Sequence, residues 1–139
     1  MDRVIALLRE KNSYLEKFYR VNEHELINLG EGCFDSVEEF YQARDKILDL
    51  IHVIDGLIEE ENARMLGAVT ALQKAEVESL LASKDELVQN ILAQDLQVLT
   101  YIEKEKSNII RDLRSTRQAR RAVGAYANVE RIKEMDEKI

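Results

Sequence analysis

The 139-residue chain contains no proline, so no residue along it obliges a helix to break. Its five glycines are too few for a fold built from many β-hairpins. Alanine, glutamate, lysine, leucine and arginine supply 67 residues, about half of the chain. That share, combined with an apolar period of about 3.5 to 3.6 residues, is typical of long helices and coiled coils. We therefore predict an all-α fold and exclude all-β and βαβ folds.

Apolar residues recur at intervals of three and four in three parts of the chain, as one face of a helix requires. The first helix is predicted over residues 2–29 and ends at Gly30-Glu31-Gly32, because glycine adopts the left-handed backbone of a helix C-terminus. The residues Ser36 to Glu39 predict a capping box that starts the second helix, over residues 36–65. The short connection between the two makes an antiparallel hairpin.

The boundaries after Gly67 are less sharply marked. Residues 70–73 (Thr-Ala-Leu-Gln) and 83–86 (Ser-Lys-Asp-Glu) are both candidate capping boxes. They leave open a short helix over residues 70–82, or its fusion with the last helix, predicted over residues 84–123. We expect an elongated antiparallel bundle or coiled coil of three to four helices, with residues 1–127 as one domain and residues 128–139 as a flexible tail.

The antiparallel hairpin predicts which residues of the first two helices face each other. With the turn near Gly32 and Cys33, the facing pairs are Leu15 with Leu50, Phe18 with Ile47, Leu26 with Phe40, and Asn22 with Arg44. The aromatic residues gathered between positions 14 and 41 are then core side chains of this hairpin. Asn22 and Arg44 form a polar layer between apolar ones, which can fix the register at some cost in stability.

Charge and cysteine content predict the compartment. The net charge of −7 repels nucleic acid and anionic lipid. The single cysteine, Cys33, forms no internal disulfide, which suits a reducing cytoplasm. The first residues, MDRVIALLREK, do not read as a signal peptide, and the longest stretch without a charged side chain, residues 65–73, is far too short to cross a membrane. We expect a soluble cytoplasmic protein that binds neither membrane nor nucleic acid.

Catalytic constellations are absent from the sequence. His24 and His52 lie on different predicted helices, and the paired Glu-x-x-His motifs of a di-iron bundle do not occur. The residues after His52 also differ from the His-x-Leu-Lys-Gly pattern of phosphotransfer domains. Cys33 has no activating base beside it, and no phosphate-binding glycine loop is present. We therefore predict no enzyme activity, no cofactor and no metal.

The last predicted helix carries two features that stand out from an ordinary core helix. Its apolar band is broader than the seam of a two-stranded coiled coil, so we expect it to contact two surfaces, one of them on another molecule. It also carries a basic ridge, which suits the helix macrodipole or an acidic protein partner. The residues of that ridge are Arg111, Arg114, Arg117, Arg120 and Arg121.

Residues 34–50, with the run Arg44-Asp45-Lys46-Ile47-Leu48, are the first of three segments that share a resemblance. They are similar to the second helix of the family of FlgN/FliT-type flagellar export chaperones. The leucine-and-glutamate pattern of residues 7–15 resembles its first helix, and residues 114–126, which end in small residues and a tyrosine, resemble its C-terminal helix. The resemblance extends over most of the chain through loose helical patterns.

The resemblance implies a cytoplasmic chaperone without catalytic activity. Such proteins bind the helical ends of hook-associated or filament-cap subunits, keep them soluble and deliver them to the type III export apparatus. We expect the client helix to dock on an apolar groove of the last helix, with the arginines meeting acidic client residues. The alternative is a coiled-coil adaptor whose band is a homodimer seam. The predicted client-binding residues are Ile102, Ile109, Ile110, Leu113, Val123 and Tyr126.

Overall fold

The structure, a computed structural model, describes the backbone of residues 1–65 and 67–138 and the side chains of residues 1–65 and 67–133. Helix makes up 91% of the chain and no strand occurs in the described residues, which confirms the all-α prediction. The described helices are α1 (Asp2–Gly30), α2 (Val37–Arg64) and α3 (Ala71–Lys138).

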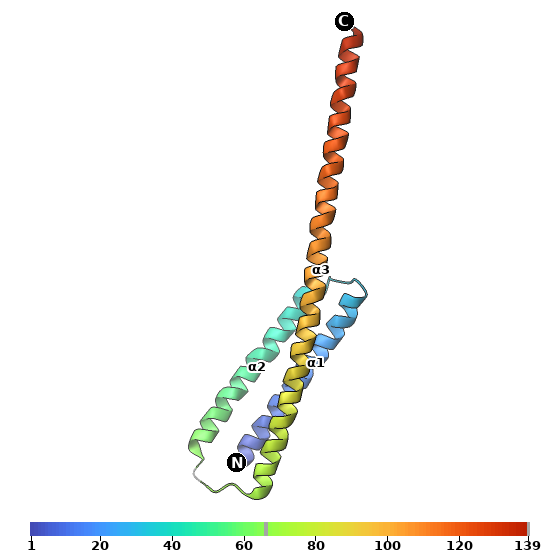
Figure 1. Cartoon of the computed structure of the whole chain (residues 1–139). Coiled ribbons are helices and arrows are strands. Elements are labelled where there is room, and N and C mark those ends of the chain that lie inside the picture. The colour runs from blue at the N-terminus through green and yellow to red at the C-terminus, as the bar shows by residue number, and fades with distance from the viewer. Residues whose placement is uncertain (66, 139) are drawn as a thin grey trace. The chain divides into compact units, whose positions relative to one another are not determined.

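Two compact units divide the chain, the N-terminal unit Met1–Tyr101 and the C-terminal unit Ile102–Ile139. The boundary therefore falls inside α3, whereas the sequence analysis placed it after residue 127. Helix continues past that predicted boundary to Lys138. In the N-terminal unit, α1, α2 and residues 71–101 of α3 run up, down and up beside one another (Figure 1). This is the predicted antiparallel bundle.

The turn from α1 to α2 contains a glycine with a positive φ angle, as the sequence predicted. Gly32 has φ of +79°, and the amides of Gly32 and Cys33 donate to the carbonyls of Leu29 (3.1 Å) and Asn28 (2.9 Å). This is the double hydrogen bond of a Schellman C-terminus. The predicted capping box at Ser36 is wrong, because the Ser36 hydroxyl makes no cap hydrogen bond. It donates instead to the buried carboxylate of Glu25, 3.0 Å away.

The start of α3 shows whether residues 70–82 form a separate short helix. The Thr70 amide donates to Gln73 Oε1 and the Gln73 amide donates to Thr70 Oγ1, both at 3.1 Å, so this capping box is formed. The second candidate box, residues 83–86, lies inside continuous helix. The short helix and the last helix are therefore one element, α3.

The core of the N-terminal unit draws side chains from all three helices. Leu15 and Phe18 of α1, Ile51 of α2 and Ile91 of α3 form one buried cluster, and Ile47 packs against it, in agreement with the predicted pairing of Phe18 and Ile47. The predicted pairing of Leu15 with Leu50 is wrong. Leu50 is 45% exposed and Ile51 takes the buried position. One residue along a helix turns a side chain by about 100°, so this small error in register exchanges the two.

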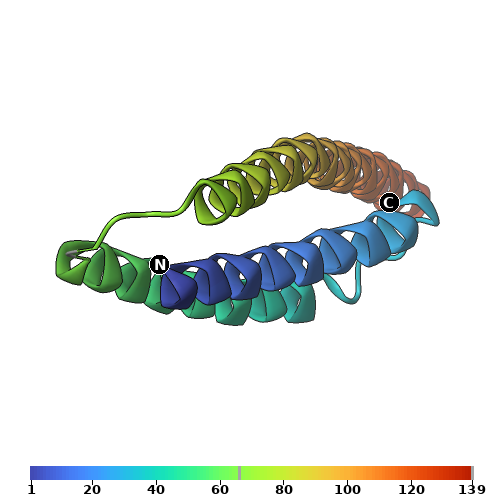
Figure 2. The same cartoon turned by 90° about the horizontal axis from the view of Figure 1, so that it is seen from below.

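Seen from below, the end of α2 and the start of α3 lie at the same end of the N-terminal unit (Figure 2). Within the described helices, none combines the length and the apolar character needed to cross a membrane.

Candidate functional site

Five of the six predicted client-binding residues are exposed in the structure. Ile102 is half-buried, and the exposed fraction of the others ranges from 43% for Ile110 to 69% for Val123. By contrast, all buried apolar side chains of the described residues lie between Val4 and Val98. Nothing described in this chain therefore packs these residues into a core.

Helical geometry separates the predicted residues into two groups. At about 100° per residue, Ile102, Ile109 and Leu113 lie within roughly 40° of one another around α3, and Ile110 flanks them. We call these four residues the apolar band. Val123 lies toward the same side of the helix. Tyr126 points roughly 100° or more away from the band, so it does not close its end as predicted.

Four of the five arginines form an oblique row rather than a ridge along one side, and Arg121 adjoins the end of that row. Each step of three residues turns back by about 60°, so the row from Arg111 to Arg120 winds around half of the helix. Arg120 thereby reaches the side of the helix that carries Leu113. All five side chains are exposed, and none forms an ion pair with a side chain that the structure describes.

The sequence analysis missed the continuation of this row. Val123, Tyr126, Val129 and Ile132 follow Arg120 at the same three-residue spacing, and Val129 and Ile132 are 51% and 60% exposed. These last two residues fall in the segment predicted to be a tail. The three-residue spacing of the arginines continues through Val129 and Ile132, and this continuation was the sequence pattern that could have placed both residues in the helix.

The two units carry opposite net charge. The N-terminal unit has ten basic and twenty acidic side chains, a net charge of −10. The C-terminal unit has ten basic and seven acidic side chains, a net charge of +3. Acidic partners are therefore attracted to the C-terminal unit, although the whole molecule is acidic.

A polar layer crosses the N-terminal unit, as the pairing of Asn22 and Arg44 predicted. The two side chains meet at a third that the sequence did not reveal. Asn22 Nδ2 donates to Asp95 Oδ1 (3.1 Å), and Arg44 Nη2 lies 3.2 Å from the same oxygen. The Arg44 guanidinium also lies over the rings of Phe18 and Phe40, 4.8 and 5.2 Å from their centroids. Cation–π contacts and the ion pair together hold Arg44 in place.

A hollow of about 270 Å³ opens beside this layer, between α2 and α3. Leu15 and Phe18 of α1 lie at its floor. We call it the α2–α3 groove. The residues that line its two walls are Arg44 and Leu48 of α2, and Val88, Ile91, Leu92 and Asp95 of α3.

A second hollow, of about 360 Å³, lies between α1 and the start of α2. It is lined by the Glu25 and Ser36 pair and by Arg20, His24 and Phe40, among others. Glu25 is 3% exposed, and the Ser36 hydroxyl is the donor that compensates its buried carboxylate. This contact ties the end of α1 to the start of α2.

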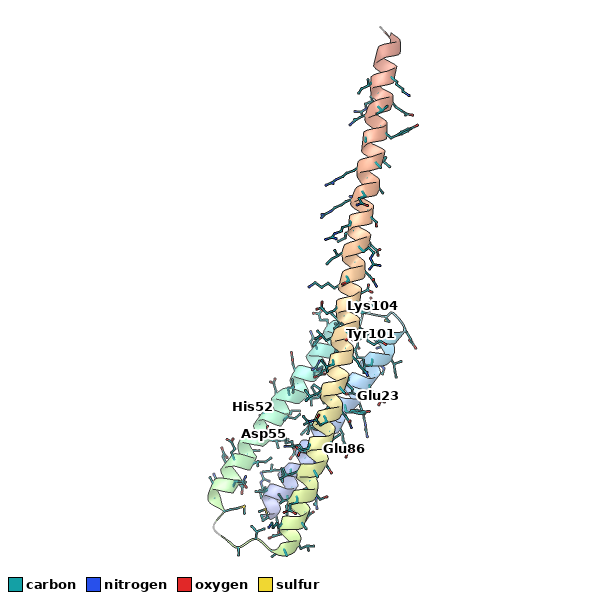
Figure 3. The ribbon with its side chains drawn as sticks, viewed as in Figure 1. Glu23, His52, Asp55, Glu86, Tyr101 and Lys104 are labelled. Atoms are coloured by element: carbon teal, nitrogen blue, oxygen red, sulfur yellow. The ribbon has the colours of Figure 1, made fainter. Side chains whose placement is uncertain are left out.

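The residues weighed for metal binding in the sequence lie apart from one another in the described part of the chain. No group of three or more His, Cys, Asp or Glu side chains there is arranged to bind a metal ion. His52 lies exposed on α2, three residues before Asp55, which pairs instead with Lys11 of α1 at 2.7 Å (Figure 3). Cys33 is exposed in the turn between α1 and α2.

The chain matches no protein-family model, no curated protein and no solved structure.

Proposed function

We propose that this chain is a cytoplasmic export chaperone of the flagellar type III system. In this proposal the apolar band of α3 binds the helical end of a hook-associated or filament-cap subunit, keeps it soluble and delivers it to the export apparatus. The observation that carries the proposal is the band itself: Ile109, Ile110 and Leu113 are 43–53% exposed and lie next to one another on α3.

An amphipathic client helix has the geometry to cover this band. Its apolar residues, spaced by three and four, would lie against Ile102, Ile109 and Leu113. Full burial of a leucine or isoleucine stabilises a complex by about 1.5–3 kcal/mol, so the loss of one central side chain weakens binding by about tenfold or more. The arginines beside the band favour an acidic client and accelerate its association, with a small contribution each because they are exposed.

The test is binding of purified hook-associated and filament-cap subunits to the full chain, measured by calorimetry. We expect one client per chaperone and a dissociation constant raised at least tenfold by Ile110→Asp or Leu113→Asp. The matched control is Val129→Asp, because Val129 is as exposed as Leu113 (51% against 53%) but points to the opposite side of α3. Val129→Asp should bind like the wild type.

The melting temperature of each variant separates binding from folding. A fall as steep as the loss of affinity would show that Ile110 and Leu113 stabilise the fold, and would contradict the proposed site. Failure of every flagellar subunit to bind, with folding intact, would contradict the proposed function.

A coiled-coil adaptor is the second candidate function. Ile102, Ile109 and Leu113 are spaced by seven and four residues, as in the seam of a homodimer. In that case the band of one copy packs on the band of another, and a pull-down from native cells recovers the chain itself without any flagellar subunit.

A further inference from the structure

The α2–α3 groove has the apolar walls of a site for a helix. Leu48 on α2 and Leu92 on α3 line it and are 46% and 52% exposed. Beneath them Leu15 and Phe18 are buried, with 8% and 3% of their surface exposed. The groove thus has a complete floor and two half-covered walls, which is the arrangement that a further helix in a bundle would cover.

Both walls continue along their helices. On α3, Leu81 and Leu99 precede and follow Leu92 by eleven and seven residues, so they lie on the same side of the helix, and they are 40% and 52% exposed. On α2, Tyr41 precedes Leu48 by seven residues and is 40% exposed. The exposed apolar surface therefore extends over several helical turns, as a helical partner requires.

The net charge of the N-terminal unit favours a basic partner. Glu59 lies at a spacing that places it on the same side of α2 as Leu48, and Glu78 and Lys74 lie on the same side of α3 as Leu92. Asp55, Asp85 and Asp95 lie on these sides too, but they pair with Lys11, Lys84 and Arg44, and Arg44 lines the groove itself. With a net charge of −10 on the whole N-terminal unit, an acidic helix is repelled from the groove and a basic amphipathic helix is attracted.

The C-terminal unit of the same sequence meets this description. It is a helix with a net charge of +3, exposed isoleucine, leucine and valine side chains, and five exposed arginines. At about 1.5 Å per residue, residues 102–133 extend for roughly 48 Å, and the 28 residues of α2 for roughly 42 Å. We propose that the α2–α3 groove of one copy binds the C-terminal unit of a second copy, through the apolar band and the arginines that adjoin it.

This inference goes beyond the proposed function, because it requires no client. It gives the apolar band a partner while no client is bound, and it makes self-association and client binding compete for the same residues. It also differs from the adaptor alternative, in which two bands pack on each other, because here a band meets a groove.

The experiment is complementation between two variants of the full chain, measured by sedimentation. The groove variant carries Leu48→Glu and Leu92→Glu, and the band variant carries Ile110→Asp and Leu113→Asp. Each variant alone has lost one of the two complementary surfaces, so its self-association should weaken at least tenfold. An equimolar mixture still pairs the intact band of one variant with the intact groove of the other, and it should associate again.

Leu50→Glu is the matched control. Leu50 lies two residues from Leu48 and is equally exposed, at 45%, but it does not line the groove. This variant should self-associate like the wild type. Added salt should weaken the association of the wild type, because the attraction between the units is electrostatic in part. Circular dichroism confirms that each variant is folded.

Three outcomes overturn the inference. A wild-type chain that stays monomeric up to about 100 μM has no such contact of useful strength. A groove variant that associates as strongly as the wild type shows a seam between two bands instead. A mixture that fails to associate, with both variants folded, shows that the two surfaces are not partners. Client binding is measured separately, so none of these results decides the proposed function.

Discussion

Asp95 is the residue on which the polar layer of the bundle depends. Its Oδ1 accepts a hydrogen bond from buried Asn22 and pairs with Arg44, whose side chain is 15% exposed. Asp95→Ala leaves both partners without this acceptor, and we expect a loss of about 2 kcal/mol in the free energy of unfolding. The measurement is urea denaturation. Asp85→Ala, at a carboxylate that is 71% exposed, should change stability by less than about 0.5 kcal/mol, and equal losses would contradict this role.

Two of the three residues of this polar layer could be predicted from the sequence. Asn22 and Arg44 could be paired in advance, because each is polar on an otherwise apolar stripe and the hairpin connection is short. Asp95 could not, because its place depends on how α3 packs on that hairpin, which sequence spacing alone does not specify. The prediction at Ser36 failed for a related reason: its hydroxyl oxygen accepts from Asn28 Nδ2 and its proton goes to Glu25, both on α1, so the oxygen caps no amide of α2.

At the scale of elements, two glycines should respond oppositely to the same substitution. Gly32 has φ of +79°, so Gly32→Ala strains the turn and should destabilise the protein by about 1–2 kcal/mol. Gly56 lies inside α2 with open space where a Cβ would be, so Gly56→Ala should stabilise the protein by about 0.5–1 kcal/mol. Thermal melting checks both, and a shift in the same direction for the two would contradict this account.

The extent of α3 was underestimated from the sequence. The predicted capping box at Thr70 forms, whereas the similar sequence at Ser83 lies inside a continuous helix. The helix continues there because no proline or glycine lies between residues 71 and 123 to end it. A capping-box sequence can start a helix. Where the preceding residues are already helical, the same sequence is compatible with an uninterrupted helix.

Substitutions along α3 should distinguish core from surface. Ile91 is 7% exposed and belongs to the buried cluster, so Ile91→Ala should cost about 2–5 kcal/mol. Leu113 is 53% exposed, and Leu113→Ala at low protein concentration should cost less than about 0.5 kcal/mol. Chemical denaturation monitored by circular dichroism measures both. A large loss for Leu113→Ala would mean that the apolar band has a packing partner within the chain.

At the scale of the whole molecule, burial and charge divide at the same point. The described buried side chains all lie in the N-terminal unit, which is strongly acidic, whereas the C-terminal unit is basic and exposed. The sequence indicated an excess of arginine in residues 111–121, but not that the core ends at Val98, because the apolar spacing continues without interruption through Ile102 and Ile109. A core and a docking band have the same periodicity, and only burial separates them.

This division predicts an order of proteolysis by trypsin. The C-terminal unit offers Arg111, Arg114, Arg117, Arg120 and Arg121 on a helix with no buried side chain among those described, so local opening there should cost little free energy. In the N-terminal unit, opening breaks the buried cluster around Phe18 and Ile91. At low protein concentration, mass spectrometry should therefore detect cleavage at these arginines well before cleavage at Arg44. A bound client should slow cleavage at the arginines and leave the rate at Arg44 unchanged, whereas a second copy on the groove that Arg44 lines should slow both. Cleavage at Arg44 as early as at Arg114 would contradict this division of stability.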